Sequence, residues 1–167
     1  DENTFKKLHN ERKVCIHPSL VDESIPKLIE YSAKLTELKK LLLSRLGFGG
    51  GNLSMRNRAL IFAISRKTLL ITQEVLLSTL NGITFSVLDG KVPEKDRPAI
   101  IDNFNREDGP DLLLLTTSVG GLGLNLQRAN IVIFLENSWN FTEDDQAIAR
   151  AHRMGQNRQV TVFNLIT

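Results

Sequence analysis

Three side chains that can donate hydrogen bonds share one side of a segment of helical length, Asp144–Arg153. Gln146, Arg150 and Arg153 are spaced i, i+4 and i+7, so they point to the same side of that helix. Two guanidinium groups and an amide on one face suit a polyanion whose charge moves during a reaction, as in phosphoryl transfer. The alternative is a solvated face whose arginines form surface ion pairs with residues such as Asp144. The spacing alone leaves both interpretations open.

A second candidate is the string TTSVGGLGLNL (residues 116–126), which directly follows the apolar run LLLL. Open α/β sheets bind ligands at the carboxyl ends of their parallel strands, and this string would lie at such an end. Hydroxyl groups at three successive positions and glycines at 120, 121 and 123 let backbone N–H groups approach an anion closely. The alternative is a tight strand-to-helix turn whose glycines are needed for packing.

The chain lacks the phosphate loop with which many nucleotide triphosphatases hold their substrate. Its one Gly-Lys pair, Gly90–Lys91, is followed by Val92, and the cluster Gly49–Gly51 follows a predicted helix rather than a strand. No His or Cys lies at metal-ligand spacing from His152, so we expect no metal site. We therefore do not expect this chain alone to hold a nucleotide triphosphate with its metal ion.

Apolar runs alternate with segments of helical spacing, which predicts an α/β domain with a mostly parallel sheet covered on both faces. Several runs are continuously apolar, as is typical of strands buried on both sides. The predicted helices cover Lys67–Leu80, Arg97–Asn105 and Asp144–Arg153; Asp96 as the cap of the second would place Pro98 in its first turn. The predicted strands are Ala59–Ile64, Thr84–Leu88, Leu112–Thr116, Ile131–Leu135 and Val160–Leu165.

The segment before the first strand has a different character. Ser32 can cap a helix that runs through Leu46, with Gly47 as its stop. Residues 1–23 show no strong pattern and suggest an extended lead-in. We therefore divide the chain into a lead-in and linker over residues 1–31 and a main domain over residues 32–167, and we expect the amino-terminal lead-in to the sheet to be helical.

Composition excludes several other classes of protein. The chain has 167 residues, of which 41% are hydrophobic and 24% charged, with a formal net charge of +2. It is neither collagen-like nor wholly disordered, and it holds no apolar run of membrane-spanning length. The polar start DENTFKKLHN predicts no signal peptide. Its one cysteine, Cys15, excludes an internal disulfide and suits a reducing compartment.

Several motifs, in order, resemble the Swi/Snf family of superfamily-two helicase-like ATPases. TTSVGGLGLNL and SWNFTEDDQAIARAHRMGQ look like motifs V and VI of that family. HPSL (17–20), SAKLTELKKLL (32–42) and ALIFAIS (59–65) resemble the blocks that precede them. The family block between ALIFAIS and TTSVGGLGLNL is resembled by LDG (88–90), Arg97 and Phe104-Asn105. The details are most similar to the branch whose ATPases strip TATA-binding protein from promoter DNA.

The resemblance implies the second RecA-like lobe of a two-lobed motor that moves on double-stranded DNA in the nucleus. ATP would be its substrate, with Mg²⁺ held mainly by the first lobe, and no membrane would be involved. TATA-binding protein would be the displaced partner. Other motors of the family, such as nucleosome remodellers or repair translocases, remain open, as does a catalytically weak lobe that serves as a binding platform.

The resemblance also implies roles for individual residues. Arg150 and Arg153 would stabilise charge on the transferring γ-phosphate, and Gln146 would contact phosphate or the attacking water. The nucleotide-binding residues would be Gly121, Gly123 and Asn125. The residues that contact DNA would be Thr117, Ser118 and Trp139.

Three positions depart from the family pattern. Ala149 stands where the family has Asp, so a carboxylate that could orient the flanking arginines is missing. Ser138 replaces another Asp and Phe141 replaces a Pro. Because both arginines are retained, we expect ATPase activity in the complete protein, with coupling that these changes could weaken.

Overall fold

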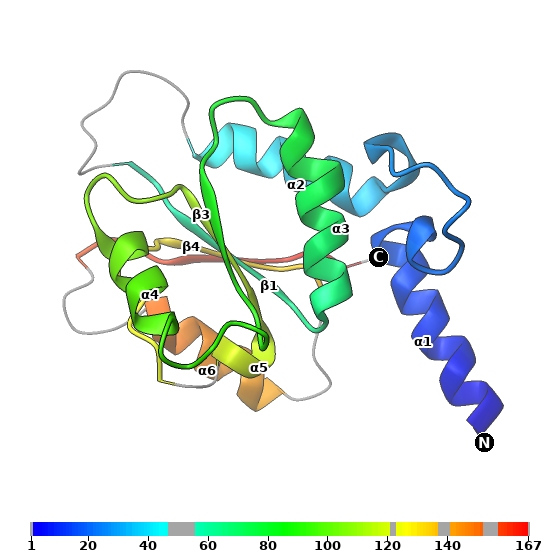
Figure 1. The fold of residues 1–167 in the computed structure, drawn as a ribbon. Coiled ribbons are helices and arrows are strands. Elements are labelled where there is room, and N and C mark those ends of the chain that lie inside the picture. Colours follow the sequence, from blue (N-terminus) through cyan, green and yellow to red (C-terminus); the bar gives the residue numbers. More distant parts are fainter. Residues whose placement is uncertain (1, 47–55, 121–122, 137–140, 152–156, 167) are drawn as a thin grey trace.

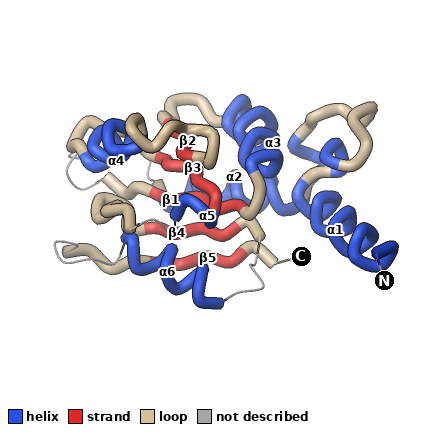
Figure 2. The backbone as a smooth tube through the Cα atoms, turned by 60° about the horizontal axis from the view of Figure 1, so that its bottom comes forward, coloured by secondary structure: helices blue, strands red, loops and turns tan. Residues whose placement is uncertain are grey.

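A five-stranded sheet forms the centre of the molecule (Figure 1). The computed structural model describes residues 2–46, 56–120, 123–136, 141–151 and 157–166. The strands follow the order β2-β3-β1-β4-β5, seen from top to bottom in Figure 2, and every neighbouring pair is parallel. The predicted α/β fold with a parallel sheet is confirmed. The strands are β1 (Ala59–Ala63), β2 (Phe85–Leu88), β3 (Leu112–Thr116), β4 (Ile131–Phe134) and β5 (Thr161–Asn164).

Helices cover both faces of this sheet (Figures 1 and 2). On one face lie α2 (Ala33–Arg45) and α3 (Arg66–Leu76), and on the other lie α4 (Arg97–Asn105), α5 (Thr117–Gly120) and α6 (Phe141–Ala151). Short 3₁₀ turns span Pro18–Leu20, Ile29–Tyr31 and Leu77–Thr79. Within the described ranges, no helix has the length and apolarity needed to traverse a bilayer.

Strand β1 shows why the apolar runs are continuous. Ala59, Ile61 and Ala63 lie in the core under α2 and α3, whereas Leu60 and Phe62 lie in the core under α4, α5 and α6. All five residues are buried, because the strand is central and both of its faces are covered. The edge strands β2 and β5 are only partly buried, which fits their more polar sequences.

Helix α1 (Glu2–Ile16) corrects the expectation that residues 1–23 form an extended lead-in. It extends away from the sheet, and only its last residue, Ile16, joins the core. Phe5 and Leu8 are exposed on it. Because the helix buries so little of its length, its sequence carries no apolar stripe from which a helix could be recognised.

Three predicted helix starts can be compared with the structure. Ser32 caps α2 as expected, since its Oγ accepts a hydrogen bond from the Leu35 N–H at 3.0 Å and donates one to the Ile16 carbonyl at 2.5 Å. Helix α4 begins at Arg97 with proline in its first turn, but the Asp96 side chain makes no capping hydrogen bond, so that detail was wrong. Helix α6 begins at Phe141, three residues earlier than the sequence pattern indicated.

A buried arginine joins the amino end of β1 to the end of α4. Arg58, only 1% exposed, donates hydrogen bonds to the carbonyls of Phe104, Arg106 and Glu107 at 2.5–2.6 Å. Those carbonyls lie at a helix end, where backbone acceptors lack intrahelical partners. Burial is the main cause that lowers the pKa of Arg58 below its ordinary value. The Arg58 side chain therefore ties the end of α4 to the amino end of β1, at the edge of the sheet opposite the carboxyl ends of the strands.

Candidate functional site

The candidate site lies at the carboxyl edge of the sheet, where β3 leads directly into α5 (Figure 1). Thr116 ends the strand and is buried, and its Oγ1 lies 3.3 Å from the Ser118 Oγ. Thr117 is 8% exposed, whereas Ser118 is open to solvent. Of Thr117 and Ser118, both expected to contact DNA, Ser118 is thus the one presented at the surface.

The glycines of the same loop serve different purposes. A Cβ atom on Gly120 would lie 2.6 Å from Cε1 of Phe62, so this glycine is required by packing. Gly123 has a φ of +75°, a conformation that favours glycine, and a Cβ atom there would lie 3.9 Å from Nη1 of Arg150. The packing interpretation therefore holds at Gly120, while Gly123 brings backbone close to an arginine. Gly121 lies outside the described residues.

Helix α6 carries the other half of the site. Ala147 and Ala151 are buried in the core, which leaves Gln146 exposed and Arg150 half-buried. The Arg150 carbonyl accepts a hydrogen bond from the Leu126 N–H at 3.1 Å, which ties the loop after β3 to this helix. The small side chains of Ala147 and Ala151 thus let α6 pack closely on the sheet, and this packing turns Gln146 and Arg150 away from the core.

Arg150 has an unsatisfied donor within the described part of the molecule. Its Nε is buried and makes no hydrogen bond, although a buried N–H normally has a partner. Its Nη1 lies beside Gly123. A guanidinium group with a free, sheltered N–H is suited to an oxyanion such as a phosphate, to which arginine can donate two parallel hydrogen bonds.

Some predicted site residues cannot be placed. Arg153 and Trp139 lie outside the described residues, as do the departure at Ser138 and His152. Asn125 is exposed, and its backbone carbonyl rather than its side chain makes a described contact. The structure thus brings Gly123 and Arg150 together and presents Ser118 at the surface after β3, and it leaves the roles of all these residues as predictions.

Asn105 is a residue whose role sequence reasoning missed. Its Nδ2 donates to the Asn125 carbonyl at 2.8 Å, and its Oδ1 accepts from the Arg128 N–H at 3.4 Å. One side chain at the end of α4 therefore holds two points of the loop that connects the site to β4. The resemblance of Phe104-Asn105 to a family block was the available signal, but it gave no role.

Asp89 and Arg66 form a second unforeseen contact at the carboxyl edge. The Arg66 Nε donates to Asp89 Oδ2 at 2.7 Å, and the Lys91 N–H donates to Asp89 Oδ1 at 2.9 Å. Asp89 is buried, while the Arg66 side chain is 43% exposed. The pair fixes the turn after β2 against the start of α3, and thereby shapes the edge beside β3.

The donor set at this edge fits a phosphate group better than a metal ion. Arg150, Gly123 and Ser118 offer N–H and O–H donors, whereas hard divalent cations prefer several carboxylate or carbonyl oxygens. In the part of the chain that the structure describes, no group of three or more His, Cys, Asp or Glu residues could hold a metal ion. The donors at this edge therefore suit an oxyanion such as a phosphate group.

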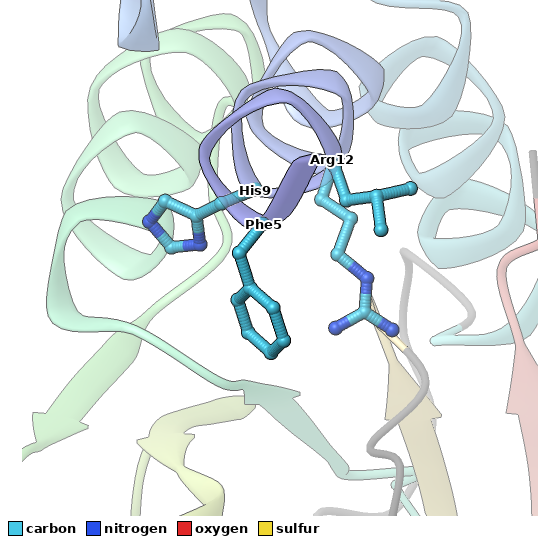
Figure 3. Close-up of a pocket in the computed structure, with 4 residues that line it drawn as sticks. Phe5, His9 and Arg12 are labelled. Carbon is cyan, nitrogen blue, oxygen red and sulfur yellow. The ribbon is translucent and has the colours of Figure 1, made fainter. Parts of the chain in front are cut away.

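An apolar cavity of about 380 Å³ lies apart from this donor set (Figure 3). It is lined by Phe5, Leu8, His9 and Arg12, all from α1, and the close-up shows the Phe5 and Arg12 side chains extending from the helix to the same side. Among the described residues, none that lines it comes from the loop after β3 or from α6. Its lining gives no reason to assign it to the chemistry at the carboxyl edge.

Comparison with known proteins identifies the domain. Residues 33–155 match the family model described as the helicase conserved C-terminal domain. The chain is 40% identical to TATA-binding protein-associated factor 172 of Homo sapiens and 34% identical to TATA-binding protein-associated factor MOT1 of Saccharomyces cerevisiae, in each case over 99% of its length. It covers only 10% and 11% of those two relatives, so it spans about a tenth of their length.

Solved structures extend this match to the fold. The SWI2/SNF2 ATPase core of Sulfolobus solfataricus in complex with double-stranded DNA superposes with a TM-score of 0.77 at 26% identity, over 97% of this chain and 32% of that one. The C-terminal part of the Fun30 ATPase domain gives a TM-score of 0.71 at 39% identity, over 81% of this chain and 41% of that one. The chain therefore belongs to the helicase C-terminal domain family, as a second RecA-like lobe of the SWI2/SNF2 ATPase type.

Proposed function

We propose that this domain is the C-terminal lobe of an ATP-dependent translocase that moves on double-stranded DNA and displaces TATA-binding protein from it. The observation that carries the proposal is the buried, unpartnered Nε of Arg150 beside Gly123, at the carboxyl edge of a parallel sheet. An arginine whose sheltered Nε has no partner among the described residues is suited to complete a phosphate site formed with a second domain.

In this proposal Arg150 stabilises negative charge on the γ-phosphate as it is transferred. Arginines supplied in this way raise the hydrolysis rate by about 10³–10⁵ in other nucleotide hydrolases. Arg153, three residues further along the chain, would act with it, and the exposed Gln146 would contact phosphate or the attacking water. Gly121, Gly123 and Asn125 would line the nucleotide side of the loop.

The first RecA-like lobe of the complete protein would supply the phosphate loop and the ligands of Mg²⁺. Mg²⁺, when bound there, would neutralise charge on the β- and γ-phosphates. The residues of this domain would contribute hydrogen-bond donors to the phosphates.

Ser118 and Thr117 would contact the DNA backbone, with Trp139 nearby. Leu126, in the segment that follows α5, donates a hydrogen bond to the Arg150 carbonyl, so the residues that would contact DNA and the arginine that would contact phosphate belong to neighbouring parts of the chain. Contacts to phosphate carry no sequence information. The lobe would therefore track along DNA without selecting a sequence.

The choice of TATA-binding protein as the displaced partner, and of the nucleus as the location, is supported by the similarity to the human and yeast TATA-binding protein-associated factors. Two alternative functions are each favoured by a different observation. The ISWI chromatin-remodeling complex ATPase ISW1 of Saccharomyces cerevisiae is 36% identical over 93% of this chain, and this similarity favours a nucleosome remodeller as the first alternative. The second alternative is a catalytically weak binding platform, which is favoured by Ala149 in place of the family's Asp.

The test uses the complete protein, purified TATA-binding protein and a labelled promoter duplex. We expect ATP, but not a non-hydrolysable analogue, to release TATA-binding protein from the DNA, and we expect DNA to stimulate ATP hydrolysis. Stimulated hydrolysis without release would indicate another motor of the family. Binding without hydrolysis or release would indicate a platform.

A further inference from the structure

The guanidinium group of Arg66 is held through only one of its nitrogen atoms. Its Nε donates a hydrogen bond to Asp89 Oδ2 at 2.7 Å, and neither Nη1 nor Nη2 makes a hydrogen bond to another described residue. The Arg66 side chain is 43% exposed, whereas Asp89 is buried. The two terminal nitrogens of Arg66 are therefore available to a ligand that arrives from solvent.

Arg106 shows how an exposed arginine binds a carboxylate that has no other task. Its Nε and Nη2 donate to the two carboxylate oxygens of Asp108 at 2.9 and 2.8 Å. At Asp89 the second oxygen instead accepts a hydrogen bond from the Lys91 N–H at 2.9 Å. Asp89 thus fixes the Nε of Arg66 and leaves the outer pair of donors, which suits a bidentate contact to a phosphate, without an acceptor among the described residues.

The Arg66–Asp89 ion pair links the two strands that flank β3. The sheet order places β3 between β2 and β1. Asp89 directly follows β2, and Arg66 begins α3 three residues after Ala63 ends β1. Ala63 pairs with Thr116, the last residue of β3, so these strands end level with each other. The ion pair therefore lies at the carboxyl edge, where Thr116 leads toward Ser118.

The connections after β1 and β3 leave the sheet on opposite faces. Helix α3 packs on one face and α5 on the other (Figure 1). Neighbouring parallel strands whose connections diverge in this way form the crevice in which open α/β sheets bind ligands. Arg66 is the first residue of α3 and Ser118 lies in α5, and both are exposed. A guanidinium and a hydroxyl group therefore stand on the two sides of this crevice.

The surroundings of Arg66 favour a polyanion over a single carboxylate. Lys67 is the next residue along the chain, and Lys91 is tied to the same Asp89 through its backbone; both lysines are exposed. Several exposed cations at one edge attract the closely spaced charges of a nucleic-acid backbone. Arginine and serine side chains are also common donors to DNA phosphates.

We propose that Arg66, held by Asp89, contacts a backbone phosphate of double-stranded DNA beside the phosphate contact of Ser118. This contact rests on the proposed function, because it adds one residue to the DNA-binding surface of the translocase. It is a contact to the backbone, so it strengthens binding to duplexes of any sequence.

The first experiment measures the affinity of the complete protein for a short labelled duplex at several salt concentrations. Arg66→Gln is the informative variant, because the glutamine Nε2 replaces the arginine Nε as a donor to Asp89, while the charge and the terminal nitrogens are lost. We expect the plot of log affinity against log salt concentration to become less steep by about 0.9, and the affinity at physiological salt to fall about three- to tenfold. Arg66→Lys, which keeps the charge, should retain nearly the wild-type slope.

Arg106→Gln is the matched control. It removes an exposed arginine charge in the same way and keeps a donor to Asp108, but its guanidinium is already occupied by that carboxylate. We expect its slope to equal that of the wild type. The DNA concentration that gives half-maximal stimulation of ATP hydrolysis should rise about three- to tenfold in Arg66→Gln and stay unchanged in Arg106→Gln.

The second experiment needs no variant and so does not depend on the folding of one. The complete wild-type protein is treated with phenylglyoxal, which modifies exposed arginines, and mass spectrometry follows each site with and without duplex DNA. We expect DNA to slow the modification of Arg66 and to leave that of Arg106 unchanged. A polyglutamate peptide added in place of DNA should protect neither arginine.

The outcomes separate this contact from the proposed function. A wild-type slope for Arg66→Gln, an equal loss of slope in Arg106→Gln, or an Arg66 that DNA does not protect would each overturn the contact. Protection by polyglutamate but not by DNA would also overturn it and would indicate an acidic protein partner. A wild-type protein that binds no duplex would refute the proposed function and the contact together, whereas DNA-stimulated hydrolysis with an unprotected Arg66 would refute the contact alone.

Discussion

Replacing Gly120 with alanine tests the packing of the loop that carries the site. The new methyl group would lie 2.6 Å from Cε1 of Phe62, a distance that Cβ contacts essentially never show. Phe62 cannot easily yield, because it is fully buried and stacks on Phe134 with ring centroids 5.2 Å apart. Overpacking of this kind costs about 1–3 kcal/mol. Because alanine is favoured over glycine in a helix by about 0.5–1 kcal/mol, we expect a net loss of roughly 1–2 kcal/mol.

Thermal unfolding of the 167-residue chain measures this loss, which corresponds to a fall in Tm of roughly 2–8 °C for a protein of this size. Gly90→Ala is the matched control, since no atom lies within 4 Å of its added Cβ and its backbone is not in the left-handed region. The double variant with Phe62→Leu should lose less than the sum of the two single variants, because the smaller side chain leaves room for the methyl group. A Gly120→Ala protein as stable as Gly90→Ala would refute the reasoning.

Three other predictions concern the amino edge, the DNA contact and the missing lobe. Arg58→Met should lower the free energy of unfolding by about 3 kcal/mol or more, since it removes a buried donor to three backbone carbonyls, of which only that of Arg106 has a second described donor, the Gly109 N–H. Arg106→Met at an exposed ion pair should change it by less than about 1 kcal/mol, and urea unfolding compares the two variants. Ser118→Ala with Thr117→Ala in the complete protein should reduce the stimulation of ATP hydrolysis by DNA but leave DNA-independent turnover nearly unchanged, and equal stimulation at two salt concentrations would make the loop a structural turn. The 167-residue chain alone should hydrolyse ATP at background, and a DNA-stimulated rate that follows its concentration through several columns would contradict the division of labour between lobes.

The sheet was predictable because its signal is local. The central strands β1, β3 and β4 are runs of four or five buried residues, and an apolar run can be read directly from the sequence. The Ser32 cap was also predictable from local sequence, because the Ser32 Oγ accepts from the N–H of Leu35, only three residues further along the chain. Helix α1 was missed because it lacks such a local signal. Only its end packs against the domain, so its sequence has no apolar periodicity.

The contacts that shape the site could not be predicted from the sequence, because they join residues that are far apart along the chain. Arg66 and Asp89 are separated by 23 positions, and Asn105 holds a loop 20 residues away. No spacing rule indicates such pairs. Motif resemblance found the arginine on α6 and the loop after β3, but the packing need at Gly120 depends on Phe62 of another strand and became visible only in three dimensions.

The central claim is that Arg150 acts on the transferring phosphate, and Arg150→Lys in the complete protein tests it most directly. Lysine keeps the charge but loses the planar fork that donates two hydrogen bonds to phosphate oxygens. We expect DNA-stimulated kcat to fall by two or more orders of magnitude, or about 3 kcal/mol, while ATP affinity and Tm change little. Arg153→Lys should behave in the same way. Near-normal turnover would contradict the account, and a large fall in Tm would show instead that the arginine serves folding.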